Sequence, residues 1–259
     1  METRPNTIFR RRIQLHALHN TTGGVVRAAL EDDFHHFLLE LKYKHGEVAE
    51  IRAEAPRHPY SVCPGAVGPL EALIGMHLDP IANAVTRHSN ASLQCTHLFD
   101  LAGLAIALAA RGDKWRTYDI EVPRHVAGRT RATLLRDDGW RLEWWVHEEQ
   151  IEAPQSYAGV NLRQGMARWV LSTLPQDEAE AALVLRRCAL IALGRLRDVD
   201  ADAHAHATGR CYAQQPERAE RALRIIGSTQ DFSARPETLC SADVVWLHQS
   251  SRRHDVSDS

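Results

Sequence analysis

The sequence predicts an α+β protein: an antiparallel meander sheet or partly closed barrel, with helices packed on one face and a helical C-terminal region. Two groups of segments alternate apolar and polar side chains, which is typical of strands with one buried face. Segments with helical spacing of apolar residues separate the two groups and follow the second. The connections within each group are too short for parallel crossovers, so we expect antiparallel neighbours.

Alternation in the N-terminal region predicts four strands. Asp32 lies in phase with the apolar residues of the second strand, and His35 opens the third strand in phase with Phe37. Both polar side chains are therefore expected to point toward the core. The predicted strands are Phe9–Leu18, Val26–Asp32, His35–Tyr43 and Val48–Ala55.

Helical spacing begins at Pro64, returns in a short helix after Pro80, and is clearest from Thr96 to Ala110. His97 precedes Leu101 by four residues and joins the apolar stripe of that last helix.

The second strand group contains one strong hairpin signal, Asp137-Asp138-Gly139, between two alternating segments. Its strands are expected at Trp115–Val122, Arg129–Arg136 and Trp140–His147, and later helices at Leu162–Leu174, Asp177–Arg197 and Glu217–Ile226. We divide the chain into an α+β sheet domain at 8–153, a helical region at 154–249 that packs on the same core or forms its own domain, and a polar, disordered tail at 250–259.

Composition and cysteine usage predict a cytoplasmic protein with neither a nucleic acid nor a membrane as its partner. The 259 residues are 44% hydrophobic and 25% charged, with a formal charge of −2. This balance gives no electrostatic drive toward nucleic acid or an anionic membrane. The basic N-terminus lacks a following apolar segment, and five cysteines without a C-x-x-C pair suggest reduced thiols. The sequence is compatible with a homo-oligomer and does not decide the oligomeric state.

The segment Cys95-Thr96-His97-Leu98 is the strongest candidate for chemistry. Thr96 or Cys95 could cap the helix, whose first-turn N–H groups favour negative charge and would push Cys95 toward its thiolate. Partial desolvation would keep His97 a neutral base. The alternative is a capped core helix in which Cys95 and His97 are satisfied core groups.

Asp32, His35 and His97 form the expected catalytic group, because an aspartate that orients a histidine fixes its tautomer. His36 points to the opposite strand face and is the weaker candidate. Arg57 ends a strand where a guanidinium could clamp a substrate carboxylate, although a solvent-facing loop arginine is the alternative.

Cofactor signatures are missing from the sequence. It contains no G-x-G-x-x-G, P-loop, G-x-S-x-G or H-E-x-x-H motif, so we expect no cofactor. Cys95 and His97 would diverge by roughly 200° on a helix. A shared metal is therefore not predicted, and a metal-dependent hydrolase is only an alternative.

Four motifs occur in the order Pro59-Tyr60, Cys63, Leu73-Ile74-Gly75-Met76 and Cys95-Thr96-His97-Leu98. Together with Leu30-x-Asp32 and a histidine that opens a strand, they resemble a bacterial family catalogued as domain of unknown function 2889, over about residues 8–110. The chain departs from that pattern in its first turn, at residues 20–24. The resemblance supports a site that includes Asp32, His97, and His35 or His36. It names no reaction.

We therefore expect a cofactor-independent acid/base enzyme, a lyase or isomerase acting on a small aromatic or alicyclic catabolic intermediate through a retro-aldol-like or proton-elimination step. His97 would be the acid or base, Asp32 its orienting partner and His35 the second acid/base group. Substrate contacts are assigned to Arg57, Tyr60, Cys95, Thr96 and His36. A non-catalytic ligand-binding or assembly protein is the main alternative.

Overall fold

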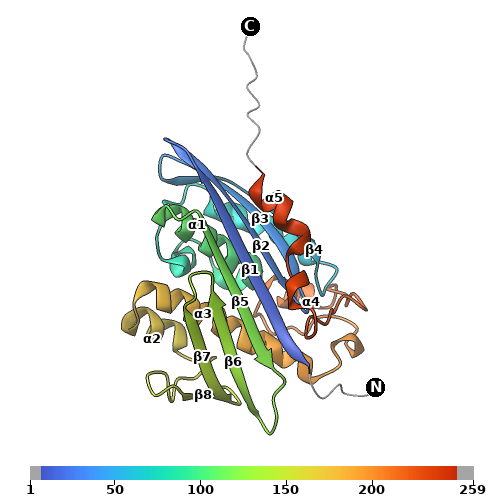
Figure 1. Cartoon of the computed structure of the whole chain (residues 1–259). Coiled ribbons are helices and arrows are strands. Elements are labelled where there is room, and N and C mark those ends of the chain that lie inside the picture. The colour runs from blue at the N-terminus through green and yellow to red at the C-terminus, as the bar shows by residue number, and fades with distance from the viewer. Residues whose placement is uncertain (1–6, 250–259) are drawn as a thin grey trace.

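The computed structural model describes residues 7–249 and contains one eight-stranded antiparallel sheet with helices against it (Figure 1). The strand order is β4-β3-β2-β1-β5-β6-β7-β8, so two sequential meanders meet where β1 pairs with β5. The predicted α+β class is confirmed, and the sheet is open rather than closed into a barrel. The strands are β1 (Ile8–His19), β2 (Gly23–Asp32), β3 (His36–Lys44), β4 (Glu47–Arg57), β5 (Trp115–Pro123), β6 (Arg129–Arg136), β7 (Arg141–His147) and β8 (Gln150–Ala153).

Register between β1 and β2 places Arg11 opposite Asp32 and Ile13 opposite Leu30. All four side chains point toward the same core, because residues two apart in a strand share a face. The polar pair therefore lies at the end of an otherwise apolar layer.

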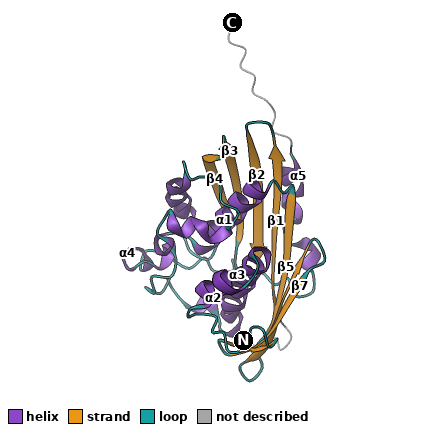
Figure 2. Ribbon diagram, turned by 90° about the vertical axis from the view of Figure 1, so that its left-hand side faces the viewer, coloured by secondary structure: helices purple, strands orange, loops and turns teal. Residues whose placement is uncertain are grey.

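Two long helices cover one face of the sheet (Figure 2). Helix α1 (Thr96–Arg111) ends where Gly112 adopts φ +73°, a left-handed conformation that glycine takes without strain. Helix α3 (Gln176–Ile191) joins the same core as α1 and the sheet. The remaining helical segments are η1 (Cys63–Leu73), η2 (Ala82–Arg87), η3 (Ala91–Leu93), α2 (Met166–Thr173), η4 (Ala192–Leu196), η5 (Val199–Ala201), η6 (Tyr212–Gln214), α4 (Pro216–Ala219), η7 (Pro236–Thr238), η8 (Ser241–Asp243) and α5 (Val244–His248).

Helix α5 packs against the opposite face of the sheet. Its Leu247 contacts Ala29 of β2, and the guanidinium of Arg27 lies 5.7 Å from the Trp246 ring centroid. Strand β2 is consequently covered on both faces. The sequence predicts helices on one face of the sheet, and α5 is an exception because it lies on the other face.

The C-terminal region differs most from the sequence prediction. The expected helix at Glu217–Ile226 is wrong beyond one turn: α4 ends at Ala219, and Arg224 and Ile225 donate backbone N–H groups to the carbonyls of Ala203 and Pro59. Leu223, Ile225 and Ile226 are 57%, 37% and 78% exposed, so the large apolar residues of this segment do not form the buried stripe of a helix. Strand β8 was not predicted, and the predicted tail 250–259 lies outside the described residues.

One hydrophobic core draws residues from both predicted regions, 8–153 and 154–249. Within the described part of the chain, none of the helices combines the length and apolarity that a membrane span requires.

Adjacent tryptophans of β7 give a test of this packing. Trp144 is fully buried, with its ring centroid 5.4 Å from that of Tyr157, whereas Trp145 is 51% exposed. Trp144→Ala is expected to lower the free energy of unfolding by about 3–5 kcal/mol in urea titrations. Trp145→Ala, the matched control, should change it by about 0.5 kcal/mol or less. Equal effects of the two substitutions would contradict the register of β7.

Candidate active site

A fully buried ion pair joins Arg11 of β1 to Asp32, the last residue of β2. The Nε of Arg11 donates to Oδ2 of Asp32 at 2.8 Å, and its Nη2 donates to the same oxygen. The cation was missed in the sequence, although alternation with Phe9 and Ile13 was the available signal for its inward direction.

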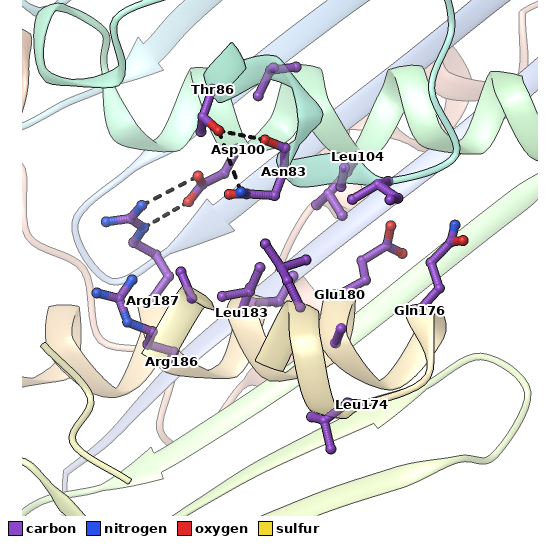
Figure 3. A pocket seen from close by; sticks show the side chains of 17 residues that line it. Asn83, Thr86, Asp100, Leu104, Leu174, Gln176, Glu180, Leu183, Arg186 and Arg187 are labelled. Atoms are coloured by element: carbon purple, nitrogen blue, oxygen red, sulfur yellow. Dashed lines mark hydrogen bonds and ion pairs between the residues drawn. The ribbon is translucent and has the colours of Figure 1, made fainter. Parts of the chain in front are cut away.

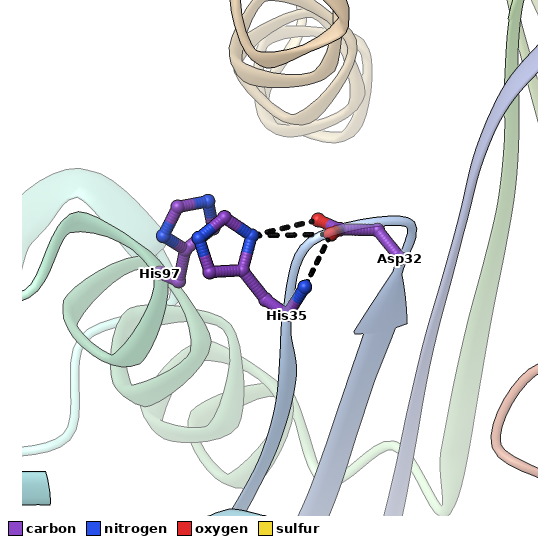
Figure 4. A group of neighbouring side chains, drawn as sticks. All are labelled: Asp32, His35 and His97. Atoms are coloured by element: carbon purple, nitrogen blue, oxygen red, sulfur yellow. Dashed lines mark hydrogen bonds and ion pairs between the residues drawn. The ribbon is translucent and has the colours of Figure 1, made fainter. Parts of the chain in front are cut away.

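The other carboxylate oxygen of Asp32 organises the turn into β3. Oδ1 accepts the backbone N–H groups of Phe34 and His35, each at 2.7 Å, and lies 3.1 Å from Nδ1 of His35 (Figure 4). Burial by itself raises the pKa of Asp32, but Arg11 and His35 outweigh it and hold that pKa well below its usual range. Because an ionised carboxylate only accepts hydrogen bonds, Nδ1 of His35 carries the proton.

His97, the second residue of α1, stacks on His35. The two ring centroids are 3.9 Å apart and the rings are inclined by 30° (Figure 4). Among the described residues, the buried Nε2 of His97 has no hydrogen-bond partner. An unpaired buried polar atom is costly and is a frequent mark of function.

Burial, the main cause, lowers the pKa of both histidines, and that of His97 falls well below its ordinary value. The neighbouring His35 and Arg11 lower the pKa of His97 further, while Asp32 opposes the shift in both rings. The rings of His35 and His97 are therefore neutral, and the neighbouring carboxylate of Asp32 is ionised.

The structure pairs Asp32 with His35, whereas the sequence analysis expects Asp32 to orient His97. Asp32 orients His35, not His97, because His35 belongs to the turn that Asp32 caps and β3 begins only at His36. His97 approaches from α1 and contacts the ring of His35 rather than the carboxylate.

Both histidines line a cavity of about 390 Å³. Tyr60, Cys95 and Thr96, expected to bind substrate, also line it. The remaining walls come from segments near Phe34 and Phe37, from the end of α3 through η5, and from the loop at 210–214.

Arg57 and His36 lie outside this cavity. Arg57 donates to the carbonyl oxygens of Asp32, Asp33 and His35, and so supports the turn from behind. His36 points to the opposite sheet face, where its Nε2 lies 2.8 Å from Oδ2 of Asp243. The structure therefore gives both residues structural partners.

Cys95 occupies the N-cap position of α1, but its side chain makes no capping hydrogen bond. Burial raises the pKa of the Cys95 thiol to about 12. The expected tendency toward a thiolate is wrong, because loss of hydration outweighs the helix N-terminus.

Metal binding has a geometric basis, since Asp32, His35 and His97 offer ligand atoms within 4.8 Å of one another. The buried Arg11 already supplies a positive charge to the same carboxylate, and one of its oxygens is shared by two guanidinium N–H groups. A metal cation at this position would either displace the Arg11 guanidinium or be repelled by it.

A second cavity of about 200 Å³ lies between α1 and α3 (Figure 3). Its polar lining includes the ion pair between Asp100 and Arg187, with an Nε to Oδ2 distance of 2.7 Å. Other polar side chains and four leucines also line it; the polar ones are Asn83, Thr86, Gln176, Glu180 and Arg186. No histidine is among its described lining residues, so the histidine pair marks the larger cavity as the candidate active site.

Residues 9–111 match the model of a family described as "Protein of unknown function (DUF2889)". The match confirms the resemblance inferred over about residues 8–110 and includes Arg11, Asp32, His35 and His97. No curated protein and no solved structure matches the chain.

The lowered pKa of His97 predicts a specific pH dependence of stability. As pH falls through about 6.5, the unfolded histidine takes up a proton that the folded one does not. The contribution of His97 to the free energy of unfolding is therefore complete above that pH. Below it, the free energy of unfolding falls by up to about 1.4 kcal/mol per pH unit for one histidine. His97→Gln should flatten the profile between about pH 5 and 6.5 in urea titrations.

The control for this profile is His77→Gln, because the side chain of His77 is 84% exposed. Identical slopes for the wild type and His97→Gln would show that His97 is not held neutral in the folded state.

Proposed function

We propose that the chain is a cofactor-independent acid/base enzyme, a lyase or isomerase acting on a small aromatic or alicyclic intermediate. The proposal rests on the chain of contacts from Arg11 through Asp32 to His35. This chain ends beside His97, whose Nε2 has no partner among the described residues, at the wall of a cavity of about 390 Å³. A cavity of this size suits a small ligand.

His35 is the general base in this proposal. Asp32 accepts the proton-bearing Nδ1, so the lone pair on Nε2 is free for the substrate. When the ring gains a proton, the ionised Asp32 stabilises the imidazolium, as in other carboxylate-histidine pairs.

His97 is the second acid/base group or a hydrogen-bonding partner for the substrate. In this proposal, its unpaired Nε2 and the first-turn N–H groups of α1 stabilise the negative charge that develops on the substrate.

A retro-aldol-like step uses these groups without any redox change. His35 removes the proton of a substrate hydroxyl, which becomes a carbonyl as the adjacent carbon–carbon bond breaks. The electron pair of that bond stays on the released carbon as a carbanion, which a conjugated carbonyl or aromatic ring stabilises by delocalisation. The histidinium then returns the proton to the new carbanionic carbon. A proton elimination or isomerisation would use the same transfers.

The test is turnover of a panel of aromatic dimers and cyclic hydroxy or keto acids by the wild type, His35→Ala, His97→Ala and Asp32→Asn. On any substrate that the wild type converts, the loss of a positioned acid/base group is expected to lower kcat/KM by about 10²–10⁴-fold. Asp32→Asn should have an effect of similar size, because an amide no longer fixes the His35 tautomer or stabilises its cation.

His36→Ala is the matched control, because His36 is the next residue and points to the opposite face. Full activity of His35→Ala and Asp32→Asn would remove the proposal. Stoichiometric zinc, iron or manganese in the active protein would instead favour a metal-dependent hydrolase that uses the Asp32, His35 and His97 ligand set.

A further inference from the structure

The histidine-lined cavity has an unbalanced charge. Five arginines line it, whereas no aspartate or glutamate occurs among its described lining residues. A cavity lined by charge of one sign concentrates ligands of the opposite sign. The arginines are Arg163, Arg187, Arg197, Arg210 and Arg224.

Four of these arginines are held by carboxylates that do not line the cavity. The partners anchor the guanidinium groups in the wall and offset part of their charge. The pairs are Arg187 with Asp100 at 2.7 Å, Arg197 with Asp202 at 2.6 Å, Arg224 with Asp200 at 2.8 Å, and Arg163 with Glu149.

Arg210 differs from the other four. It is exposed and makes no ion pair or hydrogen bond with any residue that the structure describes. It thus offers a complete guanidinium face, whose donors match the two oxygens of a carboxylate.

The backbone around Arg210 is tied to the segment that leads into α1. Tyr212 donates its N–H to the carbonyl of Gln94 at 3.0 Å, and Gly209 donates to the carbonyl of Gln214 at 2.9 Å. The side-chain amide of Gln215 donates to the carbonyls of Ser92 and Gly209. Arg210 is therefore carried on an anchored loop, close in the fold to the helix start that holds His97.

Aromatic and aliphatic side chains supply the rest of the wall. Phe34 and Phe37 lie beside His35, and Leu190, Ile191 and Tyr212 line other parts of the cavity. Such a wall suits the body of an aromatic molecule better than a phosphate group.

We propose that the substrate is an aromatic carboxylate, an inference that rests on the proposed function. Arg210 binds its anionic group, and its reacting carbon lies against His35 and His97. The wall arginines add a favourable potential, and Arg210 supplies the direct contact. Neutral aromatic analogues of the same shape should bind more weakly.

Matched probes test this directly. Isothermal titration calorimetry would compare para-coumarate and phenylpropanoate with their methyl esters, which keep the ring and lose the charge. We expect each acid to bind the wild type about tenfold more tightly than its ester, the size of one charge-assisted contact. Arg210→Gln should remove most of that preference and leave ester binding unchanged.

Arg221→Gln is the control, since Arg221 is an exposed arginine of the same C-terminal region outside the cavity. The inference is overturned if the esters bind as tightly as the acids, if no acid binds at millimolar concentration, or if Arg210→Gln behaves like Arg221→Gln. His35→Ala separates the two proposals, because it should abolish turnover yet keep the preference for the acid. A retained preference together with full turnover would contradict the acid/base function and leave the anion site standing.

Discussion

The ion pair between Arg11 and Asp32 is the interaction on which the site depends. Both side chains are removed from water, which costs several kcal/mol for each ion unless their hydrogen-bonding groups find partners. Asp32 recovers that cost through N–H groups of Arg11, Phe34 and His35. The contacts join β1, β2 and the turn into β3, so one carboxylate sets strand register, turn shape and the direction of a histidine ring.

The same pair determines the electrostatics around the histidines. A buried guanidinium keeps Asp32 ionised and at the same time disfavours protonation of the two nearby rings. His35 therefore combines a neutral ring with a fixed tautomer, the state that a base requires. The arginines of the cavity wall add positive charge without adding a competing acid to the lining.

Much of the sheet and part of the site could be predicted from local pattern. Strict alternation identified the inward direction of Asp32, and helical phase did the same for His97. The partner of each group could not be read in this way, because pairing depends on strand register and on the approach of α1. For that reason the local pattern does not identify Arg11 as a partner of Asp32, and it does not show that the ring in contact with Asp32 is that of His35.

The C-terminal region has no regular spacing of apolar residues from which its structure could be predicted. Several of its backbone hydrogen bonds are made with distant segments, as when Ile225 pairs with Pro59. The loop that carries Arg210 is likewise held near the cavity by long-range contacts, from Tyr212 to Gln94 and from Gln215 to Ser92. Short apolar segments such as the one around Leu247 become interpretable only once it is known that the second face of β2, which carries Ala29, is also apolar. Long-range contacts of this kind carry no local signal in the sequence.

Heteronuclear NMR on protein with isotope-labelled histidine tests the central claim most directly, because two-bond proton–nitrogen couplings identify the tautomer of each ring. At neutral pH the account predicts that His35 is uncharged with its proton on Nδ1 and an unprotonated Nε2. A His35 ring protonated on Nε2 alone, or on both nitrogens, would contradict the orientation of His35 by Asp32.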